Sequence, residues 1–200
     1  MTKHPLFRCH QFTRNPWFRN VDLELEAGEV RILMGPTGSG KSLFLRGLAD
    51  LDPVDQGQAW VAGQERMQLS PGHWRRQVLY LHQSAPRLPG SVLQNLQATR
   101  ESEDRTTTFN PFGVKLEQDA ASLSGGEAQL MAITRALASA PRAYLLDEST
   151  SALDRDSASM VETELRRRLE QGAAILWVTH DERIAERMRA PIMNFSELSQ

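Results

Sequence analysis

The segment Gly35-Pro36-Thr37-Gly38-Ser39-Gly40-Lys41-Ser42 constrains the fold more than any other feature of the chain. It matches the pattern G-x-x-x-x-G-K-[ST], whose glycines let successive backbone N–H groups surround phosphate oxygens at a helix N-terminus. An apolar run of strand length, Val30 to Met34, precedes it, and residues 41 to 51 follow with apolar side chains at helical spacing. This order of strand, glycine loop and helix predicts a nucleotide site in which Lys41 reaches the β- and γ-phosphates and Ser42 binds Mg²⁺.

A second alternation of strands and helices lies near the C-terminus. Ala143 to Leu146 and Ala173 to Val178 are buried-strand candidates, residues 156 to 171 have helical spacing with Gly172 as C-cap, and residues 181 to 188 are compatible with a helix. Strands that alternate with helices favour a mostly parallel sheet covered by helices. The predicted class is therefore α/β.

The remaining segments add smaller elements to this sheet. Residues 6 to 10 and 21 to 25 are expected to be strands, although their pairing cannot be derived from the pattern. Residues 91 to 98 and 127 to 139 are expected to be helical, and the polar residues 99 to 108 between them to form a loop. The middle of the chain is thus a candidate small helical lobe.

Composition limits the possible classes of protein. With 200 residues and 40% hydrophobic content, the chain can form one compact domain. Its net charge of −2, from 23 basic and 25 acidic residues, lacks the basic footprint of a nucleic-acid binder, so nucleic acid is not an expected partner. Cys9 is the single cysteine, which favours a reducing compartment, and no apolar run approaches the roughly 20 residues that span a bilayer. A membrane role is expected only through a partner.

Two acidic residues follow the predicted strand that begins at Ala143. In a parallel sheet, residues at the carboxyl ends of strands face the ligand crevice. Asp147 suits the outer shell of a phosphate-bound Mg²⁺, and Glu148 is placed to orient or deprotonate the attacking water. Together with the phosphate loop, the pair predicts hydrolysis in addition to binding.

The segment Leu123-Ser124-Gly125-Gly126-Glu127 resembles the signature motif of ABC ATPases and directly precedes a predicted helix. A serine and two glycines at a helix start form an anion site, because N–H donors and the positive end of the helix dipole meet there. In the family this motif completes the γ-phosphate pocket of the opposite subunit. The resemblance therefore implies a homodimer that holds ATP between head-to-tail subunits.

Further residues follow in the family's order. Gln83 resembles the Q-loop glutamine, which binds Mg²⁺ and reaches the membrane-domain contact, and Ser151-Ala152-Leu153-Asp154 resembles the D-loop. His180 resembles the switch histidine that contacts the γ-phosphate. Phe12 or Trp17 is expected to stack on adenine, and Phe12 is preferred for its distance from the phosphate loop.

The resemblance covers about residues 5 to 190 and implies a P-loop NTPase core of residues 1–83 and 124–200, with N-terminal antiparallel strands. Only residues 84 to 122 separate Gln83 from the signature, so a short helical subdomain is expected over residues 84–123. Two positions depart from the family: Ser149 stands where proline is common, and Glu127 where glutamine is commoner.

The implied function is hydrolysis of ATP with Mg²⁺, which drives a separate transmembrane permease from the cytoplasmic side of the membrane. Within the family, Trp74 to Val78, Leu146 to Thr150 and Leu176 to Asp181 look most like the ATP-binding subunits of bacterial iron exporters. The alternative is a soluble ABC-type ATPase of DNA repair or translation. Such proteins normally have coiled-coil heptads, tandem ATPase domains or a basic surface, none of which the sequence contains.

Overall fold

The computed structural model describes residues 4–98 and 109–198 of the chain. These residues form two compact units, one of residues 4–80, 141–148 and 168–198, and the other of residues 81–98, 109–140 and 149–167. The predicted loop at 99–108 lies outside the described residues, and the predicted domain boundaries remain a prediction.

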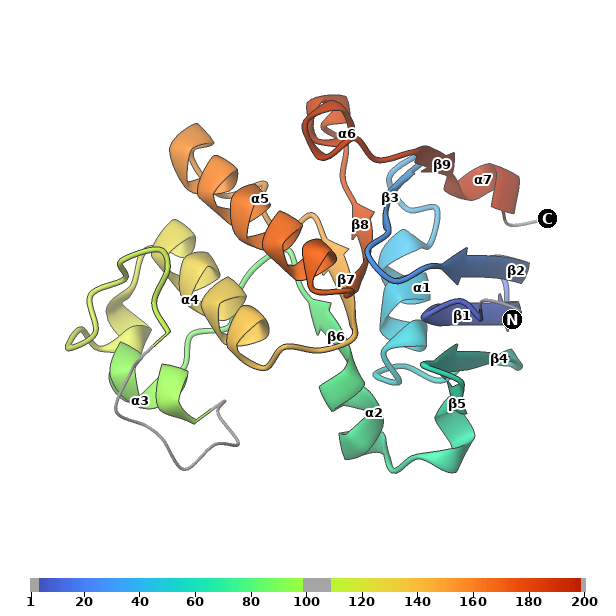
Figure 1. Ribbon diagram of the computed structural model, residues 1–200, viewed down its shortest axis with the longest axis horizontal. Coiled ribbons are helices and arrows are strands. Elements are labelled where there is room, and N and C mark those ends of the chain that lie inside the picture. Colours follow the sequence, from blue (N-terminus) through green and yellow to red (C-terminus); the bar gives the residue numbers. More distant parts are fainter. Residues whose placement is uncertain (1–3, 99–108, 199–200) are drawn as a thin grey trace. The chain divides into compact units, whose positions relative to one another are not determined.

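A five-stranded parallel sheet with the order β6-β7-β8-β3-β9 forms the centre of the first unit (Figure 1). Every residue of β7 and β8 is buried, as expected for central parallel strands that are covered on both faces. The strands are β3 (Val30–Met34), β6 (Val78–Leu81), β7 (Ala143–Asp147), β8 (Ala174–Val178) and β9 (Ile192–Asn194).

An antiparallel sheet with the order β2-β1-β4-β5 is the second layer of this unit. Buried and exposed residues alternate along β2, which places one face on the core. The strands are β1 (Phe7–Arg14), β2 (Phe18–Leu25), β4 (Gln56–Val61) and β5 (Gln64–Glu65).

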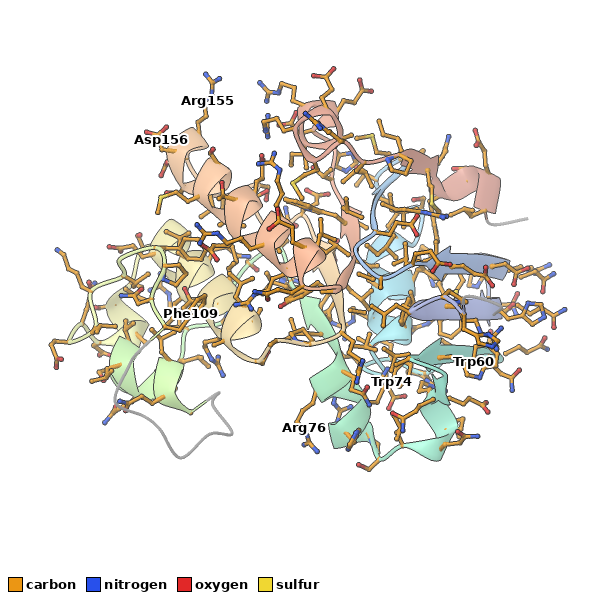
Figure 2. All side chains as sticks on the ribbon, viewed as in Figure 1. Trp60, Trp74, Arg76, Phe109, Arg155 and Asp156 are labelled. Carbon is orange, nitrogen blue, oxygen red and sulfur yellow. The ribbon has the colours of Figure 1, made fainter. Side chains whose placement is uncertain are left out.

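Helix α1 (Lys41–Leu48) lies between the two sheets (Figure 1). Its Phe44 packs against Phe12, Phe18 and Phe195 with ring centroids 5.3–5.9 Å apart, in the range of favourable aromatic pairs. Trp74 points into the same core from α2 (Pro71–Gln77), and its indole N–H donates to the carbonyl oxygen of Leu48 at 2.9 Å (Figure 2). The helix that follows the glycine loop is therefore held on several sides. Three short helices complete the unit: η1 (Arg66–Gln68), α6 (Glu182–Met188) and α7 (Phe195–Leu198).

The second unit is helical. It contains α3 (Val92–Gln97), η2 (Ala120–Ser122) and α4 (Gly125–Ala138), and α5 (Arg155–Glu170) begins in this unit and ends in the first. Apolar side chains of α3, α4 and the segment between them form its core, including Val92, Leu96, Leu123 and Met131.

The predicted α/β class, the parallel sheet and the N-terminal antiparallel strands are confirmed. Helix α1 is shorter than expected: it ends at Leu48, and Asp50 has φ +58°, which a continuing helix does not allow. The sequence pattern missed β4, β5, α2, β9 and α7, of which β5, β9 and α7 have four residues or fewer. No helix in the described ranges is both long and apolar enough to cross a bilayer.

Candidate active site

The glycine loop between β3 and α1 has the backbone conformation that its sequence predicts. Gly38 and Gly40 have φ +80° and +97°, values that residues with a side chain rarely adopt. A Cβ at Gly40 would also lie 3.2 Å from the Cβ of Trp17, whereas one at Gly38 would meet no atom within 4 Å. Gly40 therefore permits both the turn and the close approach of the Trp17 segment.

Lys41 begins α1 and turns its side chain back into the loop. Its Nζ donates to the carbonyl oxygens of Gly35 and Pro36 at 2.7 and 2.8 Å. Burial lowers the pKa of this ammonium group, and the charges of Glu148 and Asp147 act in the opposite direction. The Lys41 ammonium group is thus close enough to Glu148 and Asp147 to feel their charges. Its hydrogen-bond acceptors are the two backbone carbonyls.

The loop residues fit a Mg²⁺-bound polyphosphate. Ser42 is exposed, so its hydroxyl is available as a metal ligand, and the Asp147 carboxylate supplies the hard oxygen that Mg²⁺ prefers. The hydroxyl of Ser39 is buried and has no hydrogen-bond partner among the residues that the structure describes. A buried hydroxyl without a partner is costly, and a phosphate oxygen would supply one.

Asp147 ends β7 and is almost fully buried, with 4% of its surface exposed. The hydroxyl of Tyr80, on β6, donates to its Oδ2 at 2.8 Å. Burial and the Asp147 charge raise the pKa of Tyr80 far above its usual range, so this hydroxyl keeps its proton and acts as the donor. The sequence pattern did not single out Tyr80, because nothing marks a contact between residues so distant in the chain.

Glu148 and His180 lie together at the ends of β7 and β8. Nε2 of His180 is 3.0 Å from Oε1 of Glu148. Glu148 has φ +46°, a strained conformation for a residue with a side chain, and its N–H donates to the carbonyl of Val178 at 2.9 Å. Strain of this kind persists only where the surroundings enforce it, and it concentrates at functional sites. The structure therefore brings together two predicted catalytic residues that are distant in the sequence.

The prediction that Phe12 stacks on adenine is wrong. Its side chain is 0% exposed and packs among Phe18 and Phe44 in the core, so neither ring face is available to a ligand. Trp17, the alternative, is 48% exposed in the turn between β1 and β2, beside Gly40 of the phosphate loop. The adjacent Asn15-Pro16 pair is a turn signal that could have favoured Trp17 from the sequence.

In the second unit, the signature segment begins α4 with a reciprocal capping box. The Ser124 hydroxyl accepts the N–H of Glu127 at 3.3 Å, and a Glu127 carboxylate oxygen accepts the N–H of Ser124 at 3.0 Å and its hydroxyl at 2.7 Å. These bonds to Ser124 lower the pKa of Glu127. Gly125 and Gly126 follow as the first residues of the helix, and a Cβ on Gly125 would meet no atom within 4 Å. The hydroxyl predicted to meet phosphate is therefore already bonded to a carboxylate.

Gln83 and Asp154 also lie in the second unit. Gln83 is exposed just after β6, and the carboxylate of Asp154 accepts both the N–H and the hydroxyl of Ser157 at 2.9 Å, in the first turn of α5. Gln129, which sequence analysis missed, donates from α4 to the backbone carbonyls of His82 and Ser149 at 3.1 and 2.9 Å. The side-chain amide of Gln129 thus holds the backbone of His82, which precedes Gln83, and of Ser149, which follows Glu148.

Within the first unit, the structure brings the phosphate loop together with Trp17, Asp147, Glu148 and His180, while Gln83, Ser124 to Glu127 and Asp154 belong to the second unit. No cluster of three or more histidine, cysteine, aspartate or glutamate side chains that could hold a metal ion occurs in the described part of the chain. Cys9 is buried, and this burial raises the pKa of its thiol far above the usual range, so the thiolate needed for reaction is disfavoured.

Comparison with known proteins decides the family. The family described as ABC transporter matches residues 18–151, a range that includes the phosphate loop, the signature segment and Glu148. The chain belongs to the ABC transporter family. It is an ATP-binding domain of that family, and such domains are generally ATPases.

Individual relatives agree with this assignment. The chain is 35% identical to FetA of Escherichia coli (strain K12), named a probable iron export ATP-binding protein, over 81% of this chain and 77% of FetA. It is 38% identical to the Fe(3+) ions import ATP-binding protein FbpC of Streptomyces avermitilis, over 90% of this chain and 56% of FbpC. The chain thus spans only about half the length of this second relative.

Solved structures confirm the fold. A structure described as the ATP-binding subunit of an ABC transporter superposes with a TM-score of 0.81 at 21% identity, covering 95% of this chain and 85% of the other.

Proposed function

We propose that this ABC-family chain hydrolyses ATP at sites shared by two copies of itself and drives a separate membrane permease. The Glu148–His180 pair, with its 3.0 Å contact beside Lys41 and Asp147, carries the proposal. A carboxylate with a histidine partner is suited to aligning the attacking water, whereas binding alone would require neither group.

The remaining residues are proposed for the roles that the family resemblance implies. The backbone of residues 35 to 42 and Lys41 would hold the phosphates, Ser42, Asp147 and Gln83 would hold Mg²⁺ directly or through water, and Trp17 would stack on adenine. His180 would contact the γ-phosphate. The chemistry supplied by Mg²⁺, when bound, is neutralisation of charge on the phosphates.

The second half of the site would come from the other copy. The segment Ser124 to Glu127 begins α4, and a helix N-terminus suits a phosphate of the opposite subunit; Asp154 would lie near that interface. To bind phosphate, the Ser124 hydroxyl must break its 2.7 Å hydrogen bond to the Glu127 carboxylate and donate to a phosphate oxygen instead. The two-copy site therefore forms at a cost that nucleotide binding has to offset.

A shared site predicts that activity depends on protein concentration. At concentrations below the dissociation constant of the dimer, tenfold dilution should lower ATP turnover per chain by about tenfold, because mass action sets the fraction of paired chains. Steady-state phosphate release over a dilution series measures this dependence. Turnover per chain that stays constant on dilution, with a monomeric mass, would show that one chain hydrolyses ATP alone.

Iron export is the narrower proposal, and the similarity to FetA supports it. FbpC, also named for iron, is named an importer, so the direction needs its own test. In inside-out vesicles that carry a membrane permease which binds this chain, ATP should drive iron into the lumen with the wild-type chain and not with Glu148→Gln. Lumenal iron that stays constant, or falls, on addition of ATP would contradict export.

A further inference from the structure

The Tyr80–Asp147 hydrogen bond in the first unit is not part of the machinery described above. Asp147 is buried, so few groups can reach its carboxylate, and Tyr80 donates to one of its two oxygens at 2.8 Å. A carboxylate accepts hydrogen bonds and cannot donate one, so the direction of this bond is fixed. The bond therefore fixes one of the two carboxylate oxygens of Asp147.

Tyr80 is itself held by a network of charged groups. The Arg46 guanidinium, on α1, interacts with the Tyr80 hydroxyl. Asp52 fixes this guanidinium through two bonds, from Nε at 3.0 Å and from Nη2 at 2.7 Å, and accepts a third from Nη1 of Arg14 at 2.9 Å. Asp52 is 15% exposed at its side chain, and the two arginines hold its pKa at about 2. The tyrosine ring is thus anchored at its polar end.

We propose that Tyr80 is a positioning residue that orients the Asp147 carboxylate for the Mg²⁺ of bound ATP. Hydrogen bonds to a metal-binding side chain fix its orientation, and their loss typically costs about 10- to 100-fold in metal affinity or activity. The inference rests on the proposed function, in which Asp147 serves Mg²⁺. It adds a residue of β6 that the motifs of the chain do not mark.

The chain provides a matched control. It has two tyrosines, and the second, Tyr144 on β7, is buried, but its hydroxyl has no hydrogen-bond partner within the described residues. Tyr80→Phe and Tyr144→Phe therefore remove the same atom, from a partly buried ring and a fully buried ring, and only the first removes a bond to Asp147.

The test is equilibrium binding of N-methylanthraniloyl-ATP to the full chain, in EDTA and at increasing Mg²⁺. In EDTA, Tyr80→Phe, Tyr144→Phe and the wild type should bind alike. With Mg²⁺, the concentration that gives half of the metal-dependent tightening should rise about tenfold in Tyr80→Phe and in Asp147→Asn, and stay within about twofold in Tyr144→Phe. The melting temperature of each variant without ligand shows that the fold is intact.

Three results would overturn the inference in different ways. If Asp147→Asn shifts the Mg²⁺ midpoint and Tyr80→Phe does not, Tyr80 does not position the carboxylate, and the proposed function stands. If wild-type binding does not depend on Mg²⁺, or Asp147→Asn leaves the midpoint unchanged, the assignment of Asp147 fails and the role of Tyr80 fails with it. Equal shifts in both tyrosine variants would show a general effect of the buried hydroxyls.

Discussion

Glu148→Gln is expected to lower the rate of ATP hydrolysis by about 100-fold or more while ATP still binds. The amide has nearly the shape of the carboxylate but cannot accept a proton from water, and it can still accept a hydrogen bond from His180, which lies 3.0 Å from Glu148. Phosphate release measures the rate, and fluorescence of N-methylanthraniloyl-ATP measures binding.

Glu24→Gln is a suitable control for this experiment, because it makes the same change at an exposed residue of β2 outside the proposed site. Its rate and ATP affinity should equal those of the wild type. A Glu148→Gln chain with wild-type turnover would overturn the assignment of Glu148, whereas loss of ATP binding would indicate a role in holding the nucleotide.

Phe12→Ala and Trp17→Ala are expected to affect different properties, the first the stability of the fold and the second the affinity for ATP. Removing the fully buried Phe12 ring should lower the free energy of unfolding by about 3–5 kcal/mol, since it leaves a cavity beside Phe18 and Phe44. Removing the half-exposed Trp17 should leave stability nearly unchanged and weaken ATP binding about tenfold, because stacking of a base on an aromatic ring contributes about 1–3 kcal/mol.

Urea unfolding without nucleotide and ATP binding at a temperature where both variants are folded separate the two effects. Each variant is the control for the other, because both lose an aromatic ring from the N-terminal antiparallel sheet and its turn. Unchanged ATP affinity in Trp17→Ala would remove Trp17 from the site. Unchanged stability in Phe12→Ala would contradict its place in the core.

The sequence was most informative where chemistry requires particular residues at fixed spacing. The glycines of the phosphate loop, the acidic end of β7 and the capped start of α4 each have a local pattern, and the structure has strand, loop and helix where those patterns predict them. The central strands of the parallel sheet, β3, β7 and β8, were predictable because their apolar runs are continuous.

What the sequence did not predict depends on contacts between distant segments. The partners of Phe12 come from β2 and α1, so its burial cannot be read from β1 alone. The Tyr80–Asp147 bond joins residues 67 positions apart, and the side chain of Gln129 is recognised as a bridge only when its two carbonyl partners are known. Short elements such as β5 and β9 were missed because a few residues carry no period.

The central claim is that two copies of the chain complete one ATP site, and the mass of Glu148→Gln in solution tests it most directly. Light scattering during size-exclusion chromatography should give twice the 22.5 kDa of one chain with ATP and Mg²⁺, and one chain's mass with EDTA or ADP. Slow hydrolysis in this variant preserves the ATP that holds the copies together. A mass of 22.5 kDa under all conditions, in a chain that binds ATP, would contradict the account.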